Sequence, residues 1–321
     1  MKILITGGCG FIGSHIAEFH LNKGDEVQVI DNLSTGNLKN IETFKNHPKF
    51  KCDIDDLLIW KDLKKAIEWA DRVYHFAAIV GVFKVLSDRI DVIRNNVIVC
   101  DHLFQVIANS TARPLVIFAA SSSAYGDNSK SMLNEHDDLI VKPPVHPLAT
   151  YAISKIAGES IALAYYQSAK IPVILPRLFN TIGPRQTGHY GMVVPRFIKQ
   201  AMNNKALTVF GDGTQTRSFC DVRDSVVAFD LLAKNPACIG QIINVGNDQD
   251  IRINDLAKLV DKCTGKKNTV IHVPYEEAYG VDYTDIAQRR PDITKMLSLI
   301  PFKHRWTLEQ TIQDLVDNYK A

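Results

Sequence analysis

A short apolar run followed by closely spaced glycines constrains this chain more than any other stretch of its sequence. Residues 3–13 read ILITGGCGFIG, so a buried strand would lead into a turn and then into a helix. Gly8, Gly10 and Gly13 have G-x-G-x-x-G spacing, and Gly7, Gly10 and Gly13 have G-x-x-G-x-x-G spacing. Glycine at such a turn lets the backbone approach a pyrophosphate closely, at the positive end of the following helix. A tight turn without a ligand could use the same glycines, so the wider pattern has to decide.

Short β-rich runs alternate with longer helical patterns through the first half of the chain. This alternation predicts right-handed βαβ units and therefore an α/β fold with a Rossmann-type, doubly wound parallel sheet. The rhythm breaks after Leu178, and loops with glycine and proline predict a smaller, mixed α/β substrate-binding lobe for residues 179–218 and 246–321. The domain that the glycine turn opens is expected to span 1–178, with about 219–245 returning to it. The expected strands are Ile3 to Thr6, Val27 to Ile30, Val73 to Ala77, Leu115 to Ala120 and Val173 to Leu178, and the expected helices are Ile12 to Lys23, Leu63 to Ala70, Ile90 to Ala108 and Leu308 to Tyr319.

Composition and charge argue against several classes of partner. The 321 residues carry 37 basic and 35 acidic side chains, a net charge of +2, without a long basic run. Binding to nucleic acid or to an anionic membrane is therefore not expected. No apolar run approaches the roughly 18 residues that a membrane span needs, and no signal peptide is recognised. The six cysteines are scattered without a C-x-x-C pair, which favours reduced, packed thiols over disulfides or a metal site and predicts a cytoplasmic protein.

An acidic residue at the end of the second predicted strand strengthens the case for a dinucleotide. Asp31 stands 18 residues beyond Gly13, where a carboxylate would accept hydrogen bonds from the adenosine ribose and repel a 2′-phosphate. The pattern therefore predicts NAD rather than NADP. Asp53 and residues 76–78 lie at further strand ends, where they could contact the adenine or ribose, or only pack. The expected NAD-binding residues are Gly7, Gly10, Phe11, Ile12, Gly13, Asp31, Asn32, Asp53, Ile54, Phe76, Ala77, Ala78, Asn95, Tyr151 and Lys155.

Two further patterns carry hydroxyl and amine groups. Three serines at 121–123 follow the apolar run 115–120, at the predicted carboxyl end of a buried strand, where open α/β sheets hold ligands. Tyr151 and Lys155 are four residues apart and would share one face of a helix. A phenol with its ordinary pKa near 10 is a poor base, but a neighbouring ammonium group and a positive nicotinamide would lower that pKa. Alone, the serines also fit a turn, and the tyrosine and lysine also fit a surface or packing pair.

Together these motifs resemble those of the extended short-chain dehydrogenase/reductase superfamily, in its nucleotide-sugar epimerase and dehydratase branch. The resemblance covers nearly the whole chain and is closest in pattern to UDP-sugar 4-epimerases. The second half adds Arg177-Leu178-Phe179-Asn180 before Gly183-Pro184-Arg185, then residues 210–217 and Arg289-Arg290-Pro291-Asp292. One region departs from the branch: residues 299–304 read LIPFKH where Leu-Gly-Trp/Phe-x-Pro is usual, so the C-terminal packing is expected to differ.

The resemblance implies roles for the hydroxyl and amine groups. Tyr151 would take a proton from the sugar, and Lys155 would lower the pKa of the phenol and hold the nicotinamide ribose. Ser121 would hydrogen-bond the reacting oxygen, because it stands four residues before the tyrosine of the Tyr-Gly pair at 125–126. An error of one position is left open, so a neighbouring serine could take this role.

The same resemblance implies how a sugar nucleotide would be held. A diphosphate suits bidentate arginines, and Arg217 and Arg289 are expected to reach it, with Asn180 as a further donor. Apolar residues of the second lobe would pack around the nucleoside. The expected substrate-binding residues are Ser122, Ser123, Asn180, Val194, Phe210, Arg217 and Arg289, with Phe179 and Phe219 beside the nucleoside.

The serines at 122 and 123 bear on which reaction of the branch this chain performs. Related dehydratases carry an Asp-Glu pair at these positions, and related decarboxylases commonly carry Glu at the second. A hydroxyl with an ordinary pKa cannot replace a carboxylate base, so reversible oxidation is favoured over elimination. The leading hypothesis is NAD-dependent epimerisation of a UDP-sugar at C4 through a 4-keto intermediate, with UDP-glucose, UDP-galactose or an N-acetylated analogue as substrate. The alternatives are a decarboxylase, dehydratase or reductase of the same family, and a non-catalytic NAD-binding protein.

Two predicted helices carry apolar surface beyond what the sheet requires. The helices near 90–108 and 151–168 have more apolar residues than one sheet face needs. Relatives in this branch pair such helices into a four-helix bundle between two subunits, so a homodimer is expected.

Overall fold

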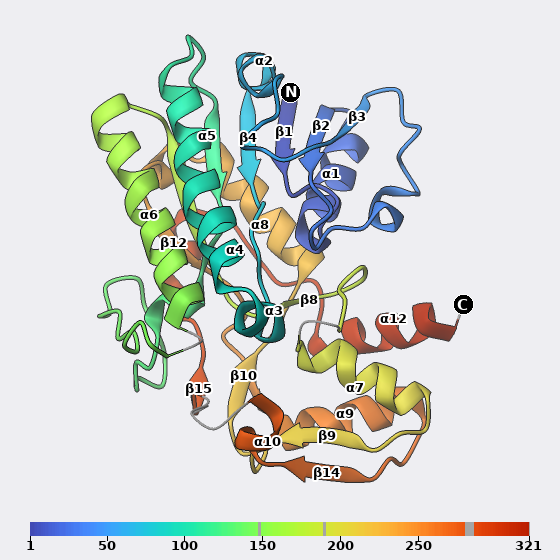
Figure 1. The fold of residues 1–321 in the computed structure, drawn as a ribbon. Coiled ribbons are helices and arrows are strands. Elements are labelled where there is room, and N and C mark those ends of the chain that lie inside the picture. The colour runs from blue at the N-terminus through green and yellow to red at the C-terminus, as the bar shows by residue number, and fades with distance from the viewer. Residues whose placement is uncertain (147–148, 189–190, 280–285, 321) are drawn as a thin grey trace.

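The centre of the molecule is a parallel sheet with helices on both faces (Figure 1). The structure is a computed structural model that describes residues 1–146, 149–188, 191–279 and 286–320. Every strand pair in this sheet is parallel, and most strands are buried on both faces, which explains their continuous apolar runs. The strands lie in the order β3 (Phe50–Ile54), β2 (Glu26–Asp31), β1 (Lys2–Thr6), β4 (Arg72–His75), β5 (Leu115–Phe118), β7 (Val173–Leu178) and β12 (Ile242–Val245), and β6 (Ala120–Ser121) pairs with β7 beyond the end of β5.

The strand order confirms the predicted Rossmann-type fold class. Starting from β1 at the centre, the chain adds β2 and then β3 on one side of it, and afterwards adds β4, β5, β7 and β12 in turn on the other side. The order therefore reverses between β1 and β4, which is where open α/β sheets form a crevice for ligands. The strand β12 follows a long excursion of the chain into the second lobe and pairs with β7. The boundaries expected between the first domain and the second lobe remain a prediction.

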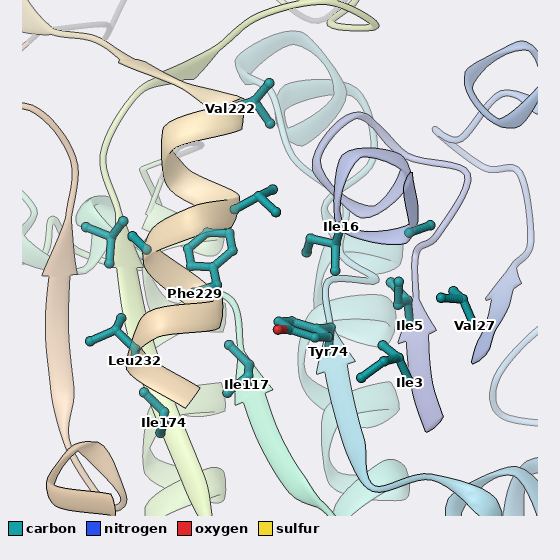
Figure 2. Close-up of a cluster of buried hydrophobic side chains, with 14 of the residues drawn as sticks. Ile3, Ile5, Ile16, Val27, Tyr74, Ile117, Ile174, Val222, Phe229 and Leu232 are labelled. Carbon is teal, nitrogen blue, oxygen red and sulfur yellow. The ribbon is translucent and has the colours of Figure 1, made fainter. Parts of the chain in front are cut away.

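Two apolar cores separate the sheet from its covering helices. On one face, Phe229 and Leu232 of α8 (Val222–Lys234) lie close to Ile117 and Ile174 of the sheet, while Ile16 of α1 (Phe11–Asn22) covers the β1 side (Figure 2). On the other face, α2 (Leu63–Trp69), α5 (Val99–Ala108) and α6 (Ala149–Ala169) bury the opposite sides of the same strands. Within the described residues, every helix is too short or too polar to cross a lipid bilayer.

The helix predicted over 90–108 is interrupted in the structure. It consists of α4 (Arg89–Ile93), a π-helical turn over Arg94–Ile98, and α5. The wider turn coincides with the buried amide of Asn96, which bonds to both backbone groups of Ile79, at 2.8 and 3.1 Å, and to the hydroxyl of Ser154 at 3.1 Å. A π-helical turn admits one extra residue, and side-chain periodicity does not reveal it.

The second lobe has a core of its own beneath the carboxyl ends of the main strands (Figure 1). Three helices pack around it, namely α7 (Val193–Met202), α9 (Ile253–Thr264) and α12 (Leu308–Lys320). Small sheets complete it. They are β9 (Leu207–Phe210) with β14 (Val270–Val273), β10 (Thr216–Ser218) between β13 (Asp250–Arg252) and β15 (Gln288–Arg289), and β8 (Thr181–Ile182) with β11 (Cys220–Asp221). The short helix α10 (Tyr275–Tyr279) lies beside β9. Two other short helices lie outside this lobe: α3 (Val82–Ser87) packs against α4, and α11 (Thr294–Leu299) packs against β12.

Candidate active site

A cavity of about 580 Å³ runs along the carboxyl ends of the parallel strands and continues between the sheet and the second lobe. Residues that directly follow β1, β2, β4, β5 and β7 line its first part, so it lies at the point where the strand order reverses. Residues of α7, β9, β10 and α10 line the other part. One cavity therefore joins the predicted cofactor site to the predicted substrate lobe.

The glycine turn is packed so tightly that side chains would not fit. Gly7 has φ +73°, and a Cβ on it would lie 2.7 Å from the backbone nitrogen of Ala77. A Cβ on Gly13 would lie 2.2 Å from the carbonyl oxygen of Gly7. Helix α1 then begins without a side-chain cap and with no acidic residue in its first turn. Its first N–H groups and its positive end therefore suit a pyrophosphate, and this cradle fits NAD.

Asp31 ties the glycine turn to the end of β2. Its carboxylate accepts hydrogen bonds from the backbone N–H groups of Cys9 at 2.9 Å and Leu33 at 2.8 Å. Burial raises the pKa of Asp31, and these backbone donors oppose the rise. The carboxylate is thus held at the cavity wall, where the ribose hydroxyls of the cofactor would be bound.

The other predicted cofactor residues divide into two groups. Asp53 and Ile54 lie outside the described cavity wall: the Asp53 carboxylate accepts from Gln28 at 2.7 Å and pairs with Lys51 at 3.0 Å, and the Ile54 side chain is half exposed. Residues 55–57, just beyond the same strand, line the cavity instead. The end of a predicted strand thus indicates roughly where the chain reaches the cofactor cavity, but not which residue lines it. Those that do line the cavity are Gly7, Gly10, Phe11, Ile12, Gly13, Asp31, Asn32, Phe76, Ala77, Ala78, Asn95, Tyr151 and Lys155.

Ser121 and Tyr151 are neighbours in the cavity. Ser121 ends β6, Tyr151 lies in the first turn of α6, and both line the cavity. Burial raises the pKa of Tyr151, whereas the nearby Ser121 hydroxyl and the positive charge of Arg289 lower it. Among the three serines, Ser121 is therefore the one that the fold places against the phenol.

Lys155 lies farther from the phenol than its spacing suggests. Its ammonium donates to the backbone oxygen of Ala119 at 2.9 Å and lies 6.0 Å from the centre of the Tyr151 ring. Burial lowers the pKa of Lys155 to about 8, although the charge of Glu159 opposes this shift. Ser121 and Arg289, rather than Lys155, are the described groups that lower the pKa of Tyr151. The role of Lys155 in activating the phenol stays a prediction.

The second lobe brings together two arginines that are far apart in the sequence. Arg217 on β10 and Arg289 on β15 are direct neighbours in a parallel pair, and both line the cavity. Arg217 is braced by its donation to the backbone oxygens of Thr216 at 2.7 Å and Ile286 at 2.8 Å. Two adjacent guanidinium groups suit a diphosphate. The other predicted substrate residues, Ser122, Ser123, Asn180, Val194 and Phe210, also line the cavity, as do Phe179 and Phe219.

The comparison with protein families decides the family of this chain. Residues 3–246 match the family model described as "NAD dependent epimerase/dehydratase family". The chain belongs to this family. NAD is accordingly its cofactor, in agreement with the glycine cradle and Asp31.

Relatives in this family share most of their length with the chain. A UDP-N-acetyl-alpha-D-glucosaminuronate decarboxylase from Bacillus cytotoxicus is 33% identical over 99% of this chain and 98% of its own. UDP-glucuronic acid decarboxylase 1 from Danio rerio is 30% identical over 99% of this chain and 72% of its own. The crystal structure of a UDP-glucuronic acid 4-epimerase from Bacillus cereus, in complex with UDP-glucuronic acid and NAD, is 30% identical with a TM-score of 0.88 and covers 100% of this chain and 99% of its own.

The buried ammonium of Lys155 should make this family member less stable near neutral pH than it would be without that charge. Because the folded-state pKa is about 8 and the ordinary value about 10.5, the unfolded chain binds more protons between these values, and stability rises with pH across that window. Lys155→Met should therefore be more stable than the wild type at pH 7, by on the order of 3 kcal/mol. Urea unfolding at pH 7 and pH 9.5 should show this difference shrinking, and a constant difference would contradict it.

Proposed function

We propose that the chain oxidises C4 of a UDP-sugar and then reduces the resulting 4-keto sugar from the opposite face, so that it acts as a UDP-sugar 4-epimerase. Bound NAD would accept the hydride from C4 and return it. Tyr151 would take the proton of the C4 hydroxyl as the hydride leaves and give it back at the end. Ser121 would hydrogen-bond the same oxygen.

The contact between Ser121 and Tyr151 carries this proposal. It lies in the same cavity as the glycine turn and the paired arginines, so one ligand held at its diphosphate could present its sugar to the phenol. Anchoring at the diphosphate would leave the sugar free to turn over between the two hydride transfers. Residues 122 and 123 supply hydroxyls where a carboxylate base would be needed for elimination.

Decarboxylation is the second candidate, because the relatives from Bacillus cytotoxicus and Danio rerio bear that name. If the sugar is a uronic acid, oxidation at C4 places a carbonyl β to the C6 carboxylate. The bond between C5 and C6 can then break with the carbonyl taking up its electron pair, and carbon dioxide leaves without any base. Serines at 122 and 123 are therefore compatible with this outcome as well. The shared step is the oxidation at C4.

Product analysis distinguishes the two outcomes. The protein would be incubated without added reductant with UDP-glucose, UDP-N-acetylglucosamine, UDP-glucuronic acid and UDP-N-acetylglucosaminuronic acid, the last two labelled at C6. We expect NMR spectra to show the C4 epimer of at least one sugar with the label retained. Release of labelled carbon dioxide and formation of a UDP-pentose would show that the protein is a decarboxylase and not an epimerase. Unchanged spectra for all four sugars would contradict both.

A homodimer formed through α5 and α6 is part of this proposal. Three isoleucines next to that region are exposed, namely Ile90, Ile93 and Ile98, with Ile90 82% exposed. They lie on α4 and the π-helical turn that lead into α5. Such side chains are candidates for burial between two subunits. The cytoplasmic location stays a prediction as well.

A further inference from the structure

Arg196 lines the substrate part of the cavity, although its sequence context did not single it out. It lies on α7, two residues after Val194, and its guanidinium carbon is 3.8 Å from the centre of the Phe210 ring. The Nη2 atom donates to the backbone oxygen of Thr208 at 3.1 Å. A stacked aromatic ring and a backbone acceptor therefore hold the guanidinium in one place.

Two nitrogen atoms of this guanidinium are buried without acceptors. Neither Nε nor Nη1 of Arg196 has a hydrogen-bond partner among the described residues, and both atoms are shielded from solvent. Burial lowers the pKa of Arg196, and the neighbouring Tyr279 phenol opposes that shift. A buried donor without an acceptor destabilises the protein, and more so when it is charged. An acceptor on a ligand in the cavity would remove this destabilisation.

Gln215 presents the complementary group on the same part of the wall. Its amide nitrogen donates to the backbone oxygen of Phe210 at 2.8 Å, which fixes the orientation of the amide. Its carbonyl oxygen Oε1 is buried and has no donor among the residues that the structure describes. Arg196 and Gln215 both contact Phe210, and together they present two donor atoms and one acceptor atom that lack partners among the described residues. Both side chains line the cavity.

We propose that Arg196 and Gln215 read the base of the sugar nucleotide, with Arg196 donating to a carbonyl oxygen and Gln215 accepting from the neighbouring ring N–H. A pyrimidine-2,4-dione has this edge, because its N3–H lies between two carbonyl oxygens. Cytosine has the reverse at this edge, since N3 is an acceptor and N4 a donor. Unpaired buried polar groups reject such a mismatch. The pair would therefore select uridine over cytidine nucleotides.

This inference rests on the proposed function only in taking a pyrimidine nucleotide as the ligand, and it does not depend on which reaction follows. It is tested by calorimetric titration of the NAD-loaded protein with uridine, UDP and CDP, without turnover. The wild type should bind UDP at least about tenfold more tightly than CDP. Arg196→Met should weaken the binding of UDP and of uridine by the same factor, about 10- to 100-fold, and change the affinity for CDP far less.

A second variant and a matched control make the result decisive. Gln215→Leu should likewise reduce the preference for UDP over CDP. Arg223 is the control, because its guanidinium carbon lies 3.3 Å from the centre of the Trp306 ring, yet it lies outside the described cavity wall. Arg223→Met should leave the preference unchanged. Bound NAD and the melting temperature should be recorded for each variant, since a misfolded variant would lose NAD along with UDP.

Three outcomes would overturn the inference. If Arg196→Met lost the same factor of affinity for UDP and for CDP, and lost less for uridine, Arg196 would be assigned to the phosphates. Unchanged affinities in both variants would make the two side chains structural only. A wild type that does not discriminate UDP from CDP would remove the selectivity itself. A wild type that binds neither nucleotide would instead contradict the proposed function, so the two failures are distinguishable.

Discussion

Replacing Tyr151 with phenylalanine should reduce turnover of the accepted UDP-sugar at least about 1000-fold, as expected for loss of a general acid–base group. The substitution removes one oxygen and leaves the ring in place. NAD content and the affinity for UDP should stay within about twofold, because neither the glycine cradle nor the paired arginines depend on the phenol oxygen. Turnover would be measured by the NMR assay on the sugar that the wild type converts.

Tyr165→Phe is the matched control for this experiment. Tyr165 lies on the same helix α6, and its hydroxyl donates to Asp101 at 3.2 Å, outside the described cavity wall. The Tyr165→Phe variant loses the same phenol oxygen as Tyr151→Phe, but its turnover should equal that of the wild type. If Tyr151→Phe also kept more than about a tenth of the turnover, the phenol would not be the proton-transfer group. If the wild type bound NAD and UDP without converting any sugar, the chain would be a binding protein.

The parts of the site that local chemistry dictates could be predicted from the sequence. Gly7 and Gly13 are required because the turn between β1 and α1 leaves no space for a Cβ, and that requirement is visible in the glycine spacing. Ser121 follows a buried strand, and Tyr151 follows from spacing on a helix. These features bring the two hydroxyls into one cavity, since parallel strands end at the same edge of the sheet.

The parts that depend on distant pairings could not be predicted in this way. Arg217 and Arg289 are expected at the diphosphate only from the family resemblance; they become neighbours because β10 and β15 pair, and no local pattern encodes that register. The position of Lys155 against the backbone of Ala119 depends on how α6 packs on the sheet. Arg196 carries no motif at all. Its part in the cavity wall follows from its stacking on Phe210, which lies on a strand of the second lobe.

A buried ion pair fastens the helix that carries Tyr151 and Lys155 to the sheet. Glu159 on α6 accepts two hydrogen bonds from Arg177 on β7, at 2.9 and 2.7 Å, and their side chains are only 4% and 3% exposed. The Arg177 guanidinium also lies 4.7 Å from the centre of the Tyr125 ring. Glu159→Gln leaves a buried guanidinium uncompensated, so we expect the free energy of unfolding in urea to fall by about 3–5 kcal/mol.

Two further variants separate the charge from the packing. The double variant Glu159→Met with Arg177→Met removes both charges and should be less destabilised than Glu159→Gln, because no buried charge is left alone. Asp255→Asn, which breaks an exposed ion pair with Lys258, should leave stability unchanged within error. A Glu159→Gln variant as stable as the wild type would contradict the argument. Because the charge of Glu159 raises the pKa of Lys155, its removal should also shift the Lys155-dependent change in stability to lower pH.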